Sequence, residues 1–416
     1  MTKRSIISTA LLGLLAASGA SAQTTVTLYG IADAGISRVT GLANGSQTAI
    51  ASGIMEGSRF GLRGNEDLGG GYKAIFTLEN RFEIDTGSLS NRPASGLQLP
   101  DRVTTTLLAN LPAGPTTAPT VAALNAGLAG SALGVNVGPD GNRFFDRQAF
   151  VGMITPFGAF TAGRQYTPGY LVQASFDASQ TQSSLAAGQV ASLPAAFDIR
   201  LSNTIQYGIQ AAGVTATLMY GAGERAGNSK GDRFIGAMAI YKGDGFSAGL
   251  GHNQKRNEFG QKSLRNTVAG ATLNLGPGTV YGMYATIKDD NPSGLSPLFG
   301  SLGPAAPVFQ NAYNIAFRQD ARLMHIGYRL TTGPHTIVTA FNRLDDKRAV
   351  NADTDSYGVT YTYALSKRTN LNAVLTRFNN KDQGQVAPGG NGYIGGVTAS
   401  AGTDSTNIAF GIRHAF

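Results

Sequence analysis

The residues that could carry out chemistry are few in this chain and lie far apart. The four histidines, His252, His325, His335 and His414, fall on different segments, and none has a second ligand-type residue at the spacing of a metal site. The one Gly-x-Ser-x-Gly sequence, at 245–249, follows a tight turn and leads along an extended segment, whereas a nucleophile elbow joins a strand to a helix. The sequence therefore predicts no metal, no cofactor and no catalytic group, and favours a protein that is not an enzyme.

One long stretch carries almost no charge and has no regular pattern. From Pro168 to Phe197 no side-chain period is sustained, and Gly, Ser, Gln and Ala dominate. Its few charged residues are Asp177 and Asp198, and Arg200 follows just past its end. A structureless loop of this length inside a compact domain is usually functional or disordered. We expect the loop, at about 168–199, to fold into the interior of a barrel and narrow it.

Extended segments must position this loop on both sides. Residues 147–155 and 159–167 each alternate two sets of side chains and are joined by a tight turn at 156–158, a pattern typical of a β-hairpin. Alternation resumes at 201–207. The loop therefore interrupts a run of strands.

The same period of two recurs along most of the chain, with one face mainly apolar and the other mainly polar. About sixteen segments show it, at 24–39, 58–66, 72–84, 147–155, 159–167, 201–210, 214–224, 232–242, 246–256, 264–275, 278–289, 320–332, 335–345, 355–366, 369–379 and 404–416. Their length suits tilted strands that cross a membrane.

The connections between these segments are short at one end and long at the other. Long ones are expected at 41–57, 85–146, 168–200, 225–231, 257–263, 290–319, 346–354 and 380–403. Short periplasmic turns and long external loops are typical of an outer-membrane barrel, which must close because lipid cannot satisfy backbone groups. The stretch 85–146 looks like an external insertion. It is helix-compatible over Val121–Leu133 and has too few large apolar residues for a core of its own.

The first residues have the features of an export signal. Lys3 and Arg4 precede an apolar run, Ile6–Ala17, and Ala20–Ala22 is a small-residue cleavage site, so residues 1–22 are expected to be removed and the mature domain to be 23–416. The alternative is an N-terminal membrane anchor, for which the apolar run is short. Export through the Sec pathway follows from the first interpretation.

Composition narrows the class of protein further. The chain has no cysteine, which excludes disulfides, and no second apolar run long enough for a membrane helix. Its net charge is +8, or +6 without Lys3 and Arg4. An exported protein with so small a surplus is not expected to bind nucleic acid. The surplus would bias a pore toward anions.

The end of the chain carries a short specific signal. Ile408, Phe410, Ile412, His414 and Phe416 share one face of the last expected strand, and Phe416 is the terminal residue. An apolar alternating strand that ends in Phe resembles the signature by which the barrel-assembly machinery recognises outer-membrane barrels. Phe416 is therefore predicted to be an assembly signal.

Six short motifs span the mature chain, at Val26–Gly30, Ser58–Gly64, Arg147–Gly152, Gly163–Tyr166, Tyr363–Thr369 and Arg413–Phe416. Their order and spacing resemble those of general porins of the Gram-negative outer membrane, close to the beta-proteobacterial branch. The resemblance implies an all-β, sixteen-stranded antiparallel transmembrane barrel that forms a homotrimer. It also implies that each subunit has its own water-filled pore and that the third long loop folds inward as the constriction.

The resemblance further implies a constriction with arginines on the barrel wall and carboxylates on the inward loop. Matching motifs place Arg59, Arg147 and Arg200 on the basic side. Arg63 shares the face of Arg59, Arg81 faces the lumen if its strand keeps register, and Arg164 is expected behind the inward loop. On the acidic side only Asp177 and Asp198 are available, because the Pro-Glu-Phe-Gly loop tip of the enterobacterial relatives is absent.

These features predict an outer-membrane channel for passive diffusion of small hydrophilic solutes and ions, with an anion preference. Expected partners are membrane lipid and lipopolysaccharide, the assembly machinery and the permeating solutes. Alternatives are a channel specific for sugars or phosphate, a barrel enzyme, and an adhesive barrel with a filled interior. About sixteen strands leave an aqueous channel and not a packed core.

Overall fold

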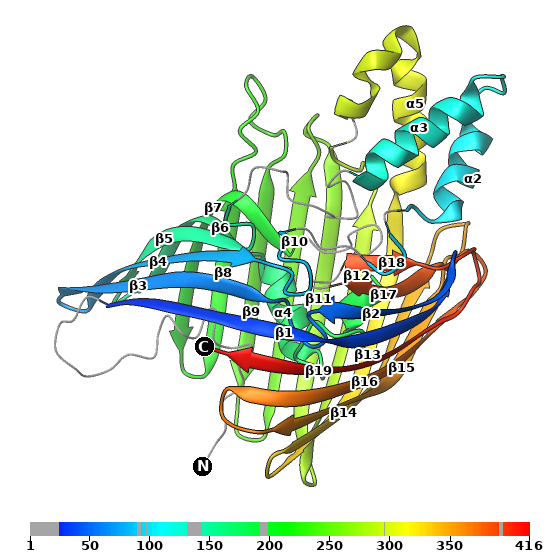
Figure 1. The fold of residues 1–416 in the computed structure, drawn as a ribbon. Coiled ribbons are helices and arrows are strands. Elements are labelled where there is room, and N and C mark those ends of the chain that lie inside the picture. Colours follow the sequence, from blue (N-terminus) through cyan, green and yellow to red (C-terminus); the bar gives the residue numbers. More distant parts are fainter. Residues whose placement is uncertain are drawn as a thin grey trace.

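The computed structural model describes residues 25–89, 93–96, 98–130, 144–191, 199–294, 296–390 and 394–416 (Figure 1). Seventeen strands form one antiparallel sheet. They are β1 (Thr25–Leu42), β2 (Gly45–Ser52), β3 (Arg59–Gly69), β4 (Tyr72–Arg81), β5 (Gln148–Thr155), β6 (Gly158–Tyr166), β7 (Arg200–Ala211), β8 (Val214–Gly221), β9 (Phe234–Lys242), β10 (Phe246–Arg256), β11 (Lys262–Leu275), β12 (Gly278–Asp289), β13 (Gln319–Thr332), β14 (His335–Asp346), β15 (Thr354–Ala364), β16 (Thr369–Asn380) and β19 (Ser405–Ala415).

The sheet closes on itself through β1. One edge of β1 pairs with β19, and the other edge pairs with β2 along its second half and with β3 along its first half. The strands β2 and β3 thus lie end to end and share one position, so sixteen positions surround the barrel. Gly30 and Phe416 complete the closure by exchanging backbone hydrogen bonds of 3.0 Å each. The predicted sixteen-stranded antiparallel barrel is confirmed.

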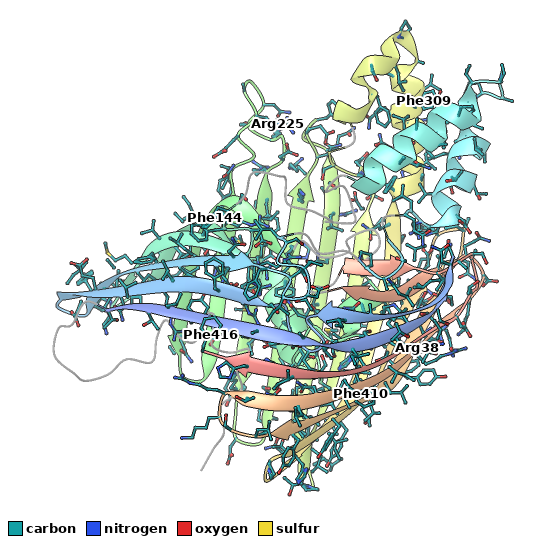
Figure 2. The ribbon with its side chains drawn as sticks, viewed as in Figure 1. Arg38, Phe144, Arg225, Phe309, Phe410 and Phe416 are labelled. Carbon is teal, nitrogen blue, oxygen red and sulfur yellow. The ribbon has the colours of Figure 1, made fainter. Side chains whose placement is uncertain are left out.

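Side chains alternate between the outside and the lumen along each strand. Leu28 of β1 faces Leu62 of β3 in register, and both are exposed on the outside, as are Val151 and Phe410. Figure 2 shows Phe410 and Phe416 on the outer surface, on and beside β19. An apolar exterior of this kind is what a membrane-spanning barrel presents to lipid.

Most predicted strands agree with the structure to within two or three residues, and the main error concerns the first long loop. Residues 41–57 are predicted to be loop, but 45–52 form β2, which pairs with the outer half of β1. The chain leaves the sheet at 53–58, between β2 and β3, and returns to β1 at Arg59. Because the strand is interrupted at 53–58, side chains of this segment enter the lumen. They would not do so if the strand were continuous.

The long connections carry helices. The 85–146 insertion contains α2 (Asp101–Asn110) and α3 (Thr117–Gly130), and the 290–319 connection contains η3 (Ser296–Ala305) and α5 (Ala306–Phe317). Together they bury an apolar cluster that includes Leu107, Leu128, Phe299 and Tyr313. The insertion does not form this core alone, because the second loop supplies half of its buried residues. In the described residues, no helix is long and apolar enough to cross a membrane.

The loop that begins at Pro168 lies inside the barrel. It contains α4 (Pro168–Phe176) and η2 (Ala187–Gln189), and it packs against lumen-facing residues of β9 to β13. Inward glycines leave the space for it: a Cβ atom at Gly270 of β11 would lie 2.4 Å from the Phe176 ring. A second inward element is the hairpin of β17 (Val386–Gly390) and β18 (Ile394–Val397), which contacts the same apolar cluster through Val386.

Candidate pore constriction

Period-two alternation places a row of arginines on the lumen face of the first strands. Arg59 and Arg63 of β3 lie on the face opposite to the lipid-exposed Leu62. The guanidinium of Arg63 lies 5.3 Å from the ring centre of Tyr29 on the neighbouring β1. Arg63 is exposed within the barrel, whereas Arg59 is mostly covered.

A buried ion pair lies beside this row. Arg147, immediately before β5, is fully buried and donates from Nε to Glu79 of β4 at 2.6 Å. The Tyr29 hydroxyl donates to the other Glu79 oxygen at 3.1 Å. Glu79 therefore has two partners, as a buried carboxylate needs, and Arg147 is held by the wall and not by the inward loop.

Tyrosines join this pair to the base of the inward loop. The Tyr166 hydroxyl accepts from Arg147 at 3.1 Å and from Arg200 at 2.9 Å. Tyr170 of α4 stacks on Tyr166 with ring centres 5.2 Å apart. Burial raises the pKa of Tyr170 to about 12, so the loop meets the arginines here with a neutral group.

A second carboxylate enters the lumen at the break between β2 and β3. Glu56 pairs with Arg59 at 3.3 Å and accepts from Nε of Arg413, on β19, at 2.8 Å. The buried Asp33 of β1 fixes this segment, because its carboxylate accepts the backbone N–H groups of Ile54, Met55 and Glu56 at 2.8–3.0 Å. Glu56 thus faces two arginines from two strands.

Arg81 and Arg164 lie at the edge of this region. Arg81, on β4 opposite Arg59, pairs with Asp146 at 3.1 Å. Arg164 donates to the Asp146 carbonyl at 2.6 Å and to Ser202 at 3.1 Å. In register it faces Ala149, on the same outward face as Val151. The structure brings Arg59, Arg63, Arg81, Arg147 and Arg200 together but leaves Arg164 on the other face of the wall.

Side-chain hydrogen bonds anchor the inward loop to the far wall. His325 of β13 accepts the Ala178 backbone N–H at Nε2 over 2.9 Å, and its Nδ1 lies 2.6 Å from Asn342 Oδ1. Asn342 also donates to the Leu185 carbonyl at 2.9 Å, and Ser184 bonds with Thr376 at 3.0 Å. His325 is therefore a loop anchor.

Asp177 does not face the arginine row. Its carboxylate is buried and accepts from the Ser179 N–H and hydroxyl and from the Ala187 N–H at 2.7–2.9 Å, so it closes the loop on itself. Asp198 lies outside the described residues. The carboxylates that the structure brings to the arginines are Glu56, Glu79 and Asp146, none of which is predicted from the sequence.

Two of the missed residues left a signal in the sequence. Glu79 shares its period-two face with Arg81, so the parity that favoured Arg81 also applies to it. Arg413 lies on the face opposite to Ile412 in the last strand. Glu56 left no periodic signal, because it lies where the strand is interrupted.

Three lumen-facing cations have no carboxylate partner among the described residues. Arg63 stacks on Tyr29, Arg200 bonds with Tyr166, and Arg329 of β13 donates to the carbonyls of Ala178 and Ser179 at 3.3 and 3.1 Å. The arginines named in this region are Arg59, Arg63, Arg81, Arg147, Arg200, Arg329 and Arg413, and the carboxylates are Asp33, Glu56, Glu79, Asp146 and Asp177. The arginines outnumber the carboxylates, so the described lumen is positive at this level.

A closed sixteen-position barrel with an inward loop and a charged inner wall defines a pore protein of the outer-membrane type. The sequence profile of the family described as Gram-negative porin matches residues 8–383, and the chain belongs to this family. It is therefore an outer-membrane porin, as predicted.

Similar proteins match all or part of the chain. Outer membrane porin protein 32 of Delftia acidovorans is 29% identical over 425 residues, with 100% of each chain covered. An outer membrane porin protein of Bordetella pertussis is 40% identical over 100 residues, 21% of this chain and 26% of that one. The solved anion-selective porin from Comamonas acidovorans matches with a TM-score of 0.67 at 26% identity, covering 95% of this chain and 100% of that one.

Proposed function

We propose that this porin passes small hydrophilic solutes and ions by diffusion with a preference for anions, and that Arg59, Arg63, Arg81, Arg147 and Arg200 form the basic side of its constriction. The observation that carries the proposal is the set of lumen-facing cations without carboxylate partners among the described residues. The solved porin from Comamonas acidovorans, which is described as anion-selective, supports the same sign.

Glu56, Glu79 and Asp146 form the acidic members of this constriction and keep the guanidinium groups in place. Ions pass the arginines in a cleft with low-dielectric walls, where the field raises the local concentration of counter-ions. A Debye length of about 8 Å at physiological ionic strength screens this field only partly across a narrow opening. The anion preference should therefore grow as salt is diluted.

The test is the zero-current potential across a salt gradient in planar bilayers. We expect an anion-selective parent and a shift toward cations in the Arg59→Ser/Arg200→Ser double variant. Arg225→Ser is the matched control, because Arg225 is an exposed residue between β8 and β9 that pairs with Asp232. Figure 2 places it above the barrel. A cation-selective parent, or equal shifts in the double variant and the control, would contradict the assignment.

We infer that the chain is exported after removal of residues 1–22 and that the assembly machinery reads Phe416. The ring of Phe416 is exposed beside Gly30, and its backbone closes the barrel. Phe416→Asp should reduce insertion in cells while the purified variant still folds in detergent, because its backbone bonds remain possible. Equal losses in both settings would indicate that Phe416 acts through barrel closure alone.

We also propose that the barrel assembles as a homotrimer in contact with lipopolysaccharide and membrane lipid. Support comes from the apolar outer face of the strands and from the family to which the chain belongs. Stepwise openings in groups of three in bilayer recordings, together with a trimer-sized band without heating on gels, are expected. Single steps from a protein of monomer size would contradict the trimer.

A further inference from the structure

The insertion after β4 reaches the opposite side of the pore. Its helices α2 and α3 pack with η3 and α5, which rise between β12 and β13, and we call these four elements the outer cap. Figure 1 shows them beyond the long-loop end of the barrel, and Figure 2 labels Phe309 on α5 near their tip. Around the barrel, β4 and β12 are separated by seven strand positions in either direction.

The strand order gives this separation. In one direction the strands between β4 and β12 are β5 to β11. In the other direction they are the shared β2 and β3 position, β1, β19, β16, β15, β14 and β13. The chain therefore leaves one wall at Arg81 and meets a helix above the opposite wall. The described part of this outgoing connection runs from Arg81 to the start of α2 at Asp101, apart from 90–92 and 97.

Hydrogen bonds hold the outgoing crossing to the last long loop. Ser95 Oγ accepts the Val397 N–H at 3.1 Å, and Gln98 Nε2 donates to the Val397 carbonyl at 3.0 Å. The Asp101 N–H donates to Gln385 Oε1 at 2.7 Å, at the start of α2. The loop that receives these bonds carries β17, whose Gly389 N–H donates to Gln189 Oε1 of the inward loop at 2.9 Å. The crossing is thus supported from below.

The outer cap is cohesive across its two loops. Leu107 of α2 and Leu128 of α3 are fully buried beside Phe299 and Tyr313 from the other loop. The Tyr313 hydroxyl donates to Asn125 Oδ1 of α3 at 2.9 Å. Since neither loop buries these residues alone, opening the cap exposes apolar surface on both, which favours the closed arrangement.

The outer cap carries no net formal charge. Its charged residues are Asp101 and Arg102, of opposite sign, at the start of α2. The sequence has no Asp, Glu, Lys or Arg from Val103 to Gly130, nor from 291 to 317. A cover without net charge over a charged constriction can exclude by size but adds little field of its own.

We propose that the outer cap roofs the pore mouth and limits the size of the solutes that reach the constriction. It leaves the choice between anions and cations to the arginine row. The proposal rests on the channel function proposed above and adds a second, steric filter to it. The outer cap should slow the entry of large neutral solutes and leave the entry of small ions unchanged.

The test uses Leu107→Asp, which places a carboxylate in the cap core, and Leu108→Asp as the matched control on the same helix, because Leu108 is 43% exposed. Both variants gain the same charge at almost the same place. Swelling of proteoliposomes compares the entry of a neutral trisaccharide with that of a neutral pentose. We expect the trisaccharide-to-pentose ratio to rise several-fold in Leu107→Asp and to stay at the parent value in Leu108→Asp.

Limited proteolysis of the outer cap shows whether Leu107→Asp has opened it. An opened cap with an unchanged ratio would overturn the proposal. A second variant, in which a short Gly-Ser linker replaces 103–130, keeps the test valid if Leu107→Asp does not fold. The zero-current potential should stay at the parent value in Leu107→Asp and in the linker variant. A shift as large as that of the Arg59→Ser/Arg200→Ser variant would contradict the proposal that the outer cap is a purely steric filter. The anion preference of the parent is measured separately, so failure of the constriction and failure of the roof are distinguishable.

Discussion

Two walls of the same lumen are built on opposite principles. The wall around β3, β4 and β7 presents Arg59, Arg63, Arg81 and Arg200, with Glu79 among them. The wall of β9 to β13 presents residues such as Met238, Ile240, Val268 and Leu323 at positions that also face inward. The difference shows that strand parity decides only which side of the barrel a residue faces.

The residue type that suits a lumen-facing position depends on what that position contacts. Positions on the basic wall contact solvent and passing ions, so they tolerate charged side chains, most of which are paired. Positions on the other wall contact the inward loop, whose Val172, Phe176 and Val190 need apolar partners. That wall therefore reads as apolar on both faces, as a strand buried on both sides does.

The largest expected effect breaks the pair that stiffens the basic wall. Arg147→Met leaves Glu79 buried without its closest partner, and breaking a buried pair costs about 3–5 kcal/mol. Adding Glu79→Gln removes the stranded charge, so the double variant should recover much of the loss. Urea unfolding in lipid or detergent, followed by circular dichroism or gel mobility because the chain has no tryptophan, measures both free energies of unfolding.

The Arg147→Met/Glu79→Gln variant could instead prove as unstable as Arg147→Met alone. The pair would then stabilise the wall through its packing and not through its charge. The control is Arg225→Met with Asp232→Asn, an exposed pair on the same protein. It should change stability by no more than about 1 kcal/mol, because surface ion pairs contribute little.

A smaller effect is expected from filling the space between the other wall and its loop. Gly270→Leu places a side chain where a Cβ atom would already lie 2.4 Å from Phe176 Cγ. Overpacking of this kind costs about 1–3 kcal/mol, and moving the loop relieves it. Single-channel recordings should then show a changed conductance with more current noise.

Gly282→Leu is the control for this substitution. Gly282 lies on β12 and precedes Met283, the register partner of Gly270, but it is on the outer face, where a Cβ atom would meet nothing within 4 Å. It should leave conductance and noise at the parent values. Identical recordings from Gly270→Leu and the parent would mean that the loop does not depend on this wall for its position.

The two walls also differ in how well the sequence predicts them. The basic wall follows from alternation, because Arg59 and Arg63 share the face opposite to the outward-facing Leu62, and Glu79 shares a face with Arg81. On the other wall Met238 and Ile240 alternate with Ala237 and Ala239, so both faces are apolar and hydrophobicity cannot tell them apart. The strands were predictable on both walls, but the docking surface was not.

Acidic residues show a second limit of the sequence. Asp177 was a reasonable choice for the constriction, because it lies in the inward loop. Whether its carboxylate points to a pore or closes a turn depends on backbone N–H groups two and ten residues away. Glu56 enters the lumen only because β2 pairs with β1 and the chain then leaves the sheet before β3. The alternation of side chains in 45–52 is too weak to predict β2 from the sequence.

The smallest expected effect compares one cation from each wall. Arg63→Ser removes a guanidinium that touches only Tyr29 among the described residues, so it should lower the anion preference slightly and change nothing else. Arg329→Gln removes the same charge, but it also removes bonds to the carbonyls of Ala178 and Ser179 and should loosen the inward loop. Both variants should shift the zero-current potential toward cations, more at low salt than at high salt, because ions screen the field over a Debye length. Only Arg329→Gln should add current noise. If Arg63→Ser adds as much noise as Arg329→Gln, or if neither shift depends on salt, charge and loop support are not divided between the two walls as the structure indicates.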